Sequence, residues 1–207
     1  MAKRLFDVLA SALGLLLLAP VLLAVAIAIK LDSPGPVFFR QVRVGRHGAP
    51  FRIHKFRTMA HREVDADAAT AQLTVGADAR ITRVGALLRR TKLDELAQLI
   101  DVFVGRMSLV GPRPEVPRYV ALYPPALRDK VQSVRPGITD PASLAYRDEA
   151  ARLARAADPE REYVEVVMPA KLQLSARYVD EASFTGDLRL IAATLRALWM
   201  RGPAAPT

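Results

Sequence analysis

The sequence predicts an α+β fold that is mainly helical, with an N-terminal membrane helix and a compact cytosolic domain containing a small β-hairpin. Residues 8–29 form an apolar run of 22 residues without a charged side chain. Two short strand-like segments follow this run, and most of the remaining chain has helical periodicity without an internal repeat. The expected organisation is a membrane helix over residues 1–30, a cytosolic domain over residues 31–200 and a tail over residues 201–207.

The apolar run fits two membrane arrangements. At about 1.5 Å per residue, a straight helix of this length covers roughly 33 Å, which is enough to cross the hydrocarbon core. No small-residue cleavage site follows, which argues against a removable signal peptide. One arrangement is a single spanning anchor. The other is a re-entrant, kinked helix that breaks at Pro20 and returns to the same side, since Pro removes a backbone donor and basic residues flank both ends.

The composition indicates one domain of ordinary size and a negatively charged partner. The 207 residues include 30 Lys and Arg against 21 Asp and Glu, a formal net charge of +9. Most of the excess lies in residues 1–113, which hold 17 basic and 9 acidic residues. This charge suits anionic lipid, a nucleotide diphosphate or nucleic acid. The absence of Cys excludes disulfides and thiolate metal sites, and three His residues argue against a multi-His metal site.

A β-hairpin is expected directly after the membrane helix. A turn cluster at residues 32–36, rich in Pro and Gly, separates the two. Residues 37–44 and 51–56 have the composition of short strands, and residues 45–50 form the loop between them. Residues 60–80 are rich in Ala and Asp with weak periodicity, and a loop or a short helix is expected there.

The rest of the domain is expected to be helical. Residues 81–88 have helical periodicity, and Thr91 followed by Asp94 resembles a capping box that starts a helix continuing to residue 103. A long helix is expected over residues 158–178. A last helix follows residues 185–187, and its apolar face is expected in the core, with the membrane interface as the alternative.

The candidate reactive group is the adjacent acidic pair Asp94-Glu95. It follows the basic stretch Arg89-Arg90-Thr91-Lys92. Neighbouring helical positions point about 100° apart, so one carboxylate can face a substrate while the other holds a metal or orients the first. A carboxylate can attack phosphorus and form a covalent intermediate. The simpler interpretation, in which acidic residues in a first turn offset the helix dipole, does not explain the surrounding cations.

Cations that can bind phosphate lie beside strand ends and rigid turns. The candidates are Lys55, Arg57, Arg89, Arg90, Arg113 and Arg135. Arg113 lies between two prolines, and Arg135 begins an Arg-Pro-Gly turn. Guanidinium groups bind phosphate oxygens in a bidentate manner, and Lys adds a point charge. A basic face against anionic lipid is the alternative interpretation. The segment 140–149 fits a sugar or nucleotide pocket and a turn with a helix cap equally well.

Seven motifs in order, over roughly residues 2–200, resemble one family. They are Lys3-Arg4-Leu5-Phe6-Asp7, Pro34-Gly35-Pro36-Val37-Phe38-Phe39, Gln41-Val42-Arg43-Val44-Gly45, Lys55-Phe56-Arg57-Thr58-Met59, Leu93-Asp94-Glu95-Leu96, Met107-Ser108-Leu109-Val110-Gly111-Pro112-Arg113-Pro114 and Arg135-Pro136-Gly137-Ile138-Thr139. The chain thus resembles the small monotopic phosphoglycosyl transferases, the bacterial sugar transferase family.

The resemblance implies an enzyme of glycoconjugate or exopolysaccharide assembly. The expected reaction transfers a sugar-1-phosphate from a UDP-sugar to undecaprenyl phosphate and releases UMP. Asp94 would attack the sugar-linked phosphorus and carry the phosphosugar, while Glu95 would help to hold Mg²⁺ or take the acceptor's proton. Lys55, Arg89, Arg113 and Arg135 would bind the phosphates. A re-entrant helix broken at Pro20 is implied as well.

The resemblance also implies a location and a set of partners. The expected location is the bacterial inner membrane, with the active site on the cytoplasmic face. The expected partners are the UDP-sugar, undecaprenyl phosphate and anionic lipid, without nucleic acid, and a homo-oligomer is left open. The sequence departs from the family at Ala19, where Ser usually precedes the proline, and at residues 139–144, which differ from the common Gly-Ile-Thr-Gly continuation. The alternative is a membrane-anchored basic module without catalysis, which gives the acidic pair no role.

Overall fold

The computed structural model describes residues 1–60 and 78–200 and is mainly helical. The expected tail and most of the expected 60–80 loop lie outside the described residues. The helices are α1 (Ala2–Asp32), α2 (Arg83–Thr91), α3 (Gln98–Phe103), α4 (Pro117–Val120), α5 (Pro125–Val131), α6 (Pro141–Ala145), α7 (Glu149–Leu153), α8 (Pro159–Glu162), α9 (Met168–Glu181) and α10 (Phe184–Trp199). The strands are β1 (Phe38–Val44), β2 (Pro50–Phe56), β3 (Ser108–Val110) and β4 (Gly137–Thr139).

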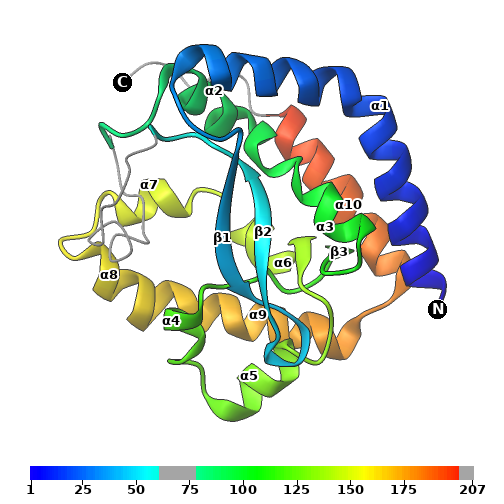
Figure 1. Ribbon diagram of the computed structural model, residues 1–207. Coiled ribbons are helices and arrows are strands. Elements are labelled where there is room, and N and C mark those ends of the chain that lie inside the picture. Colours follow the sequence, from blue (N-terminus) through cyan, green and yellow to red (C-terminus); the bar gives the residue numbers. More distant parts are fainter. Residues whose placement is uncertain (61–77, 201–207) are drawn as a thin grey trace.

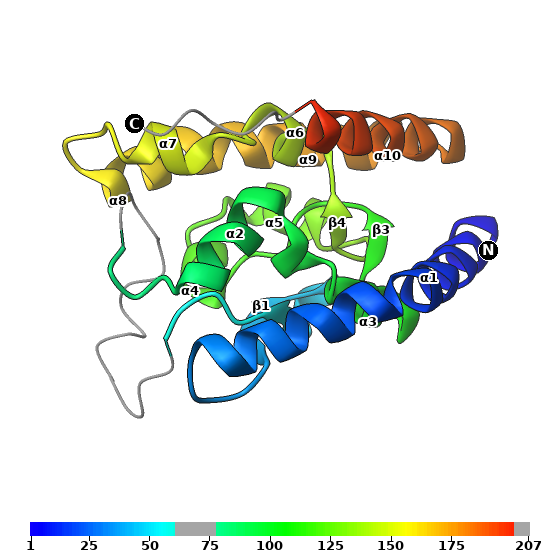
Figure 2. The ribbon, with the colours of Figure 1, turned by 90° about the horizontal axis from the view of Figure 1, so that it is seen from above.

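The elements are arranged around a small central region. Figure 2 shows α1 and the β1–β2 hairpin along one side of the molecule, with α9 and α10 along the opposite side. Helices α2, α4 and α5 and the β3–β4 pair lie between these two sides, and α7 lies along the side of α9 (Figure 2). In Figure 1, α1 follows the outer edge of the molecule and changes direction along its length.

Helix α1 confirms the expected long apolar helix. It runs without interruption from Ala2 to Asp32 and contains Pro20. The helix is long and apolar enough to cross a membrane, and only 11% of its most apolar 18-residue window is buried against the rest of the chain. A core helix of a soluble protein would be mostly buried, so this exposure fits contact with lipid better than packing within the protein.

One side of α1 packs on the rest of the protein near both of its ends. Asp7 and Ser11 are buried near the N-terminal end, and Val25 and Ile29 near the C-terminal end. Their spacing places all four on the same side of an α-helix. Val25 and Ile29 belong to a core cluster that also includes residues of β2 and α2. Burying each of these two side chains contributes about 1.5–3 kcal/mol.

The N-terminal end of α1 is also fixed by polar contacts. The Asp7 carboxylate accepts a hydrogen bond of 3.0 Å from the backbone nitrogen of Leu109 in β3. Lys3 forms an ion pair with Asp187 in α10. The Arg4 guanidinium donates to two carbonyls at the end of α3, at 2.6 and 2.9 Å. The basic residues expected to flank the N-terminal end of the membrane helix are thus held by the rest of the chain.

Arg57, which directly follows β2, fixes the C-terminal end of α1. Its side chain is buried and donates to the carbonyls of Pro34, Pro36 and Ser33 at 2.6 to 2.8 Å, and to the Ser33 hydroxyl at 2.8 Å. A longer bond of 3.4 Å reaches the carbonyl of Ile29. The sequence placed Arg57 among the phosphate-binding candidates, but its donors are used by the turn that follows α1.

We expect Arg57→Met to lower the free energy of unfolding by about 3 kcal/mol, because several buried carbonyls would lose a charged donor. Thermal unfolding of the purified protein in detergent measures this loss. Arg52→Met is the matched control, since Arg52 lies on β2, five positions before Arg57, and is exposed. Equal melting temperatures of the two variants would contradict this role of Arg57.

The predicted hairpin is confirmed, and a second small sheet was not predicted. Strands β1 and β2 pair antiparallel, with Phe38 opposite Phe56 and Val44 opposite Pro50. Strands β3 and β4 form a parallel pair, in which Ser108 lies opposite Gly137. Three-residue strands are too short to show the alternation by which strands are recognised in a sequence.

The predicted capping box is wrong. Thr91 is the last residue of α2, and its hydroxyl donates to the carbonyl of Leu87 at 2.8 Å. Lys92 then adopts a left-handed conformation with φ of 58° and ends the helix. The acidic pair lies in the 3₁₀ turn Leu93–Glu95, which precedes α3. The Thr91 side chain bonds to the preceding turn of α2 rather than to a backbone nitrogen of the following segment, so α2 ends after Thr91 instead of a new helix starting there.

The long helix near the C-terminus is confirmed, with one irregularity. Helices α8 and α9 are continuous through a π-helical segment, Tyr163–Val167. The core placement expected for the apolar face of α10 is wrong for three of its residues, because Leu188, Leu195 and Leu198 are 40–62% exposed.

Candidate active site

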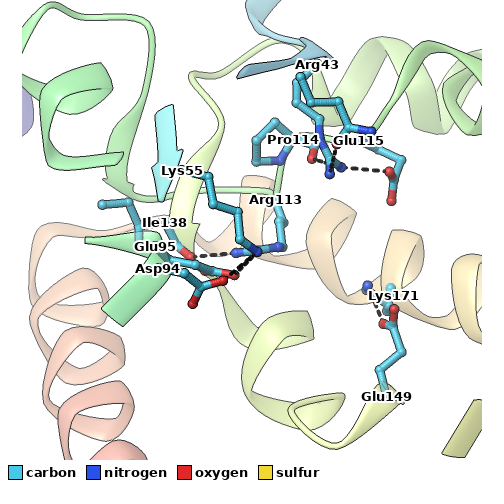
Figure 3. Close-up of polar contacts among 11 residues, drawn as sticks. Arg43, Lys55, Asp94, Glu95, Arg113, Pro114, Glu115, Ile138, Glu149 and Lys171 are labelled. Atoms are coloured by element: carbon cyan, nitrogen blue, oxygen red, sulfur yellow. Dashed lines mark hydrogen bonds and ion pairs between the residues drawn. The ribbon is translucent and has the colours of Figure 1, made fainter. Parts of the chain in front are cut away.

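The acidic pair lies where three parts of the chain meet. Its 3₁₀ turn contacts both β2 and α2, so the hairpin and the basic helix are brought beside it. Asp94 is only 2% exposed, whereas the Glu95 side chain retains 16% of its surface. Figure 3 shows the two carboxylates with Lys55 and Arg113 around them.

Lys55 and Arg113 hold the acidic pair. The Lys55 ammonium group lies 2.9 Å from Asp94 Oδ2 and 3.7 Å from Glu95 Oε1. Arg113 Nη2 lies 2.5 Å from Glu95 Oε1, and its Nη1 donates to the carbonyl of Ile138 at 3.3 Å. The second Asp94 oxygen, Oδ1, is buried and has no hydrogen-bond partner among the described residues. A buried acceptor without a partner is costly, and it is the group expected to receive a ligand.

The charges of the site keep Glu95 ionised. Burial opposes ionisation, but the positive charges of Arg113 and Lys55 outweigh it and hold the pKa of Glu95 well below its usual range. The Glu95 carboxylate in turn raises the pKa of the Arg113 guanidinium. Burial, together with repulsion from Arg113 and Lys55, lowers the pKa of Lys92 despite the attraction of Glu95. An added anion next to Lys92 would relieve this repulsion.

The lowered pKa of Glu95 predicts a dependence of stability on pH. Its ion pairs stabilise the folded protein above the ordinary carboxyl pKa of about 4.3, and this contribution is lost as the pH falls towards the lower folded pKa. We expect the melting temperature to fall as the pH drops below about 5, and Glu95→Gln to remove part of that fall. A Glu95→Gln variant with the wild-type pH profile would show that Glu95 does not contribute.

The remaining predicted cations differ in their placement. Arg89 in α2 donates to the Thr58 hydroxyl at 2.8 Å, and its pKa is lowered by burial and partly restored by the nearby Asp94. Arg89 is therefore close enough to act on the same ligand. The Arg135 side chain instead donates to the carbonyl of Gly105 at 2.9 Å, which is not part of the acidic pair's surroundings. A role for Arg135 in binding phosphate stays a prediction.

The turn that carries Arg113 is set by the β3–β4 pair. The backbone nitrogen of Gly111 donates to the carbonyl of Thr139, and that of Gly137 donates to the carbonyl of Pro112, both at 3.0 Å. A Cβ atom on Gly137 would lie 2.1 Å from the Gly111 nitrogen, and one on Gly111 would lie 2.4 Å from the Arg135 oxygen. Only glycine permits this approach of the two backbones.

We expect Gly137→Ala to lower the free energy of unfolding by about 2–3 kcal/mol, since the added methyl must push two backbones apart. Any protein that still folds would have Arg113 displaced and reduced activity. The melting temperature measures the loss of stability, and the rate of release of UMP, the product that the resemblance implies, measures the loss of activity. Gly14→Ala is the control, because a Cβ atom there meets only the flexible Leu99 side chain, at 3.3 Å. A Gly137→Ala protein as stable as Gly14→Ala would overturn this explanation.

Two cavities meet beside Arg113. The larger, about 460 Å³, is an apolar groove that has Lys92, Glu95 and Arg113 in its lining. Its apolar lining includes Leu99, Leu144, Ile191, Leu195 and Leu198. The smaller, about 240 Å³, has several charged residues and tyrosines in its lining. Asp140 lines the smaller cavity, and it also caps α6 by accepting from the Ser143 nitrogen at 2.8 Å, which confirms the helix cap considered for this segment.

The acidic pair offers a minimal set of metal ligands. The described residues contain no group of three or more His, Cys, Asp or Glu side chains that could hold a metal ion. Mg²⁺ in phosphate-transferring sites is nevertheless often bound by one or two carboxylates together with substrate phosphates. The unpartnered oxygen of Asp94 and the adjacent Glu95 fit that arrangement. Lys55 already places a positive charge between the two carboxylates.

Comparison with known proteins identifies the family. The model of the bacterial sugar transferase family matches residues 1–201. The chain belongs to the bacterial sugar transferase family. The resemblance of this transferase to the family, seen in its sequence motifs, is therefore confirmed over almost the whole chain.

Curated relatives carry related names. A Caulobacter vibrioides protein that is 41% identical, over 95% of this chain and 69% of its own length, is a UDP-glucose:undecaprenyl-phosphate glucose-1-phosphate transferase. The exopolysaccharide production protein PSS of Rhizobium leguminosarum is 40% identical over 97% of this chain and 96% of its own length. A UDP-N-acetylgalactosamine-undecaprenyl-phosphate N-acetylgalactosaminephosphotransferase of Aeromonas hydrophila is 35% identical over 95% of this chain and 43% of its own length. The relatives thus differ in sugar.

Two residues of the site were not assigned a role from the sequence. Lys92 lines the groove from its left-handed position, and Thr58 holds the Arg89 guanidinium. Lys92 lies inside the basic stretch before the acidic pair, and this position could have indicated that it belongs to the site. Nothing in the sequence indicated that a hydroxyl 31 positions before Arg89 would contact it.

Proposed function

We propose that this transferase moves a sugar-1-phosphate from a UDP-sugar to undecaprenyl phosphate and releases UMP. The observation that carries the proposal is the buried Asp94 carboxylate, with one oxygen held by Lys55 and the other without a partner among the described residues. The names of the relatives support the two substrate classes. The role in the organism would be the first membrane step of glycoconjugate or exopolysaccharide synthesis.

The reaction has two displacement steps. In the first, an oxygen of Asp94 forms a bond to the sugar-linked phosphorus, the bond from this phosphorus to the bridging oxygen breaks, and UMP leaves with the electron pair. In the second, an oxygen of the polyprenyl phosphate attacks the same phosphorus and the Asp94 carboxylate leaves. Each step brings an anion towards an anion, so preorganised positive charge lowers the barrier. Lys55, Arg89 and Arg113 supply this charge around the acidic pair.

We infer that Asp94 and Glu95 hold Mg²⁺ together with the substrate phosphates. The bound ion would neutralise charge on the phosphate oxygens. Arg113 keeps Glu95 ionised and oriented, so this carboxylate is available as a ligand across the physiological pH range. Lys55 keeps one Asp94 oxygen in place and leaves the other for the substrate.

The apolar groove suits the lipid substrate. Its charged end, at Lys92 and Arg113, matches a phosphate, and the aliphatic residues of α10 and α6 match a prenyl chain. The exposed leucines of α10, which contradicted the expected core packing, line this groove in part. Glu95 also lines the groove, so a phosphate at its charged end lies beside the acidic pair.

We further infer that α1 is re-entrant, with the domain on the cytoplasmic face of the bacterial inner membrane. The contacts at its two ends support this arrangement. Asp7 near one end bonds to β3, and Ile29 near the other packs beside β2 and accepts from Arg57. A helix that crossed the bilayer would place these two contacts on opposite sides, which a single compact domain cannot satisfy. Labels placed before Lys3 and after Lys30 should therefore report the same side.

A panel of UDP-sugars tests the proposed function. The purified protein in lipid nanodiscs is incubated with each UDP-sugar, undecaprenyl phosphate and Mg²⁺, and UMP is measured. We expect UMP to appear with at least one sugar and to depend on both the lipid and the metal. An absence of UMP with every sugar, together with binding to anionic lipid or nucleic acid, would support the non-catalytic basic module instead.

A further inference from the structure

The smaller cavity lies across Arg113 from the acidic pair. Figure 3 shows Arg113 between the acidic pair and two ion pairs, Arg43–Glu115 and Lys171–Glu149. Arg113 and all four residues of these two ion pairs belong to the lining of this cavity. A phosphate held by Arg113 therefore has this cavity directly beside it, on the side away from Asp94.

The first wall of the cavity presents charged donors and acceptors in fixed positions. Arg43 Nη1 lies 3.0 Å from Glu115 Oε1, and the Tyr163 hydroxyl donates to Glu115 Oε2 at 2.5 Å. Arg43 Nε is buried and has no hydrogen-bond partner among the described residues. This wall therefore has a carboxylate already oriented by two neighbours and one buried donor without a partner among the described residues.

The opposite wall repeats this arrangement with other residues. Lys171 Nζ lies 2.6 Å from Glu149 Oε2 and 5.7 Å from the centre of the Tyr163 ring. Asp140 is fully buried, and its Oδ2 accepts from the Ser175 hydroxyl at 2.8 Å. Donors and acceptors thus surround the cavity, which shares Arg113 and the Lys171–Glu149 pair with the groove and adds Arg43, Glu115 and Asp140.

We propose that this cavity binds the sugar ring of the nucleotide-sugar donor and selects among sugars. The inference rests on the proposed function, and it assigns the sugar ring of the UDP-sugar to the smaller cavity. A sugar hydroxyl both donates and accepts, and the walls supply both kinds of partner. The volume of about 240 Å³ is below the roughly 300–1,000 Å³ of pockets that hold a whole small ligand, so it suits one end of a nucleotide sugar.

The other two parts of the substrates fit this cavity less well. A prenyl chain would bury the Arg43–Glu115 ion pair, which the groove lacks, against hydrocarbon without hydrogen bonds, which is costly. A uracil base has its polar atoms on one edge, so it would offer hydrogen bonds to only one of the two walls. Only a ring with hydroxyls around its circumference matches polar groups on both walls.

Two tyrosines provide a matched experiment. Tyr163 and Tyr178 lie on the continuous α8–α9 helix, and each is buried and donates to a carboxylate, Glu115 and Asp187 respectively, at 2.5 and 2.7 Å. Only Tyr163 of these two lines the cavity. Tyr163→Phe and Tyr178→Phe are each made with Asp94→Asn, which arrests turnover. The affinities for UDP-glucose, UDP-N-acetylgalactosamine and UDP are then measured by calorimetry.

We expect Tyr163→Phe to weaken binding of the preferred UDP-sugar by about fivefold to tenfold, because Glu115 loses the hydrogen bond that orients it towards the cavity, and to leave the affinity for UDP unchanged. Tyr178→Phe should change neither. An equal loss for UDP and the UDP-sugar would place the nucleoside in the cavity and overturn the proposal, as would no loss for either. Tyr123→Phe, another change in the cavity lining, gives the same test if Tyr163→Phe does not fold.

A failure of the cavity assignment can be distinguished from a failure of the proposed reaction. With Asp94 intact, the same variants are assayed for UMP release with the two UDP-sugars. Normal turnover with an unchanged sugar preference in Tyr163→Phe refutes the assignment of the cavity alone. Binding of UDP-sugar that depends on Tyr163, without any turnover in the wild type, refutes the proposed reaction alone. If the wild type binds no UDP-sugar of the panel, both fail.

Discussion

Asp94→Asn should reduce UMP release by about 10⁴-fold or more, the range found when the nucleophile of an enzyme is removed. The amide keeps the size and shape of the carboxylate but cannot attack phosphorus. Because the change preserves shape and Asp94 Oδ1 has no hydrogen-bond partner to lose among the described residues, the folded structure should tolerate it. The measurement is the initial rate of UMP release with the UDP-sugar, Mg²⁺ and undecaprenyl phosphate.

A second measurement separates the covalent route from direct transfer. Without undecaprenyl phosphate, the wild-type peptide that contains Asp94 should gain the mass of the sugar phosphate, and the Asp94→Asn peptide should not. Asp129→Asn is the control, since this carboxylate is 71% exposed and lies on α5. If the Asp94→Asn variant retained the wild-type rate, the proposed mechanism would be refuted.

Arg113→Met should lower kcat/KM by about 10²–10³-fold, the usual effect of removing one charged donor at a transition state. Arg113 contacts Glu95, borders both cavities and is held by a rigid turn. Its loss also leaves Glu95 with Lys55 as its nearest cation, so we expect the free energy of unfolding to fall by about 1–2 kcal/mol. Steady-state kinetics and thermal unfolding measure the two effects separately.

The comparison with Arg113→Lys tests why an arginine is present. Lysine restores the charge but lacks the two separate Nη groups that contact Glu95 and the Ile138 carbonyl, so only part of the activity should return. Arg118→Met is the matched control, because Arg118 also pairs with a glutamate, Glu160, at 2.6 Å but lies on α4 away from the acidic pair. A similar loss of activity in Arg118→Met would mean that the effect of Arg113 is not specific to the site.

The sequence predicted the candidate reactive residues better than it predicted the local structure around them. The acidic pair, Lys55, Arg89 and Arg113 were identified from residue type and spacing, and the structure brings all five together. Their surroundings depend on contacts between distant segments. The turn at Gly111 is set by Gly137, 26 positions later, through backbone atoms that carry no sequence signal.

The errors have a common physical origin. The capping box failed because Thr91 can bond back to Leu87 as readily as forward, and tertiary contacts decide between the two. Arg57 was grouped with the phosphate-binding cations because an arginine that holds a turn has the same residue type as one that holds a ligand. The apolar face of α10 has the same periodicity whether it meets a core or a groove.

Lys55 and Arg57 are two positions apart, and together they set how far the proposed reaction takes place from the lipid surface. One contacts the acidic pair and the other contacts the last turn of α1 and the segment after it. Along an extended chain this separation is roughly 7 Å. In the proposed re-entrant arrangement, the acidic pair is therefore held close to the end of the apolar helix, where a phosphate on a long-chain alcohol arrives without leaving its own layer of headgroups.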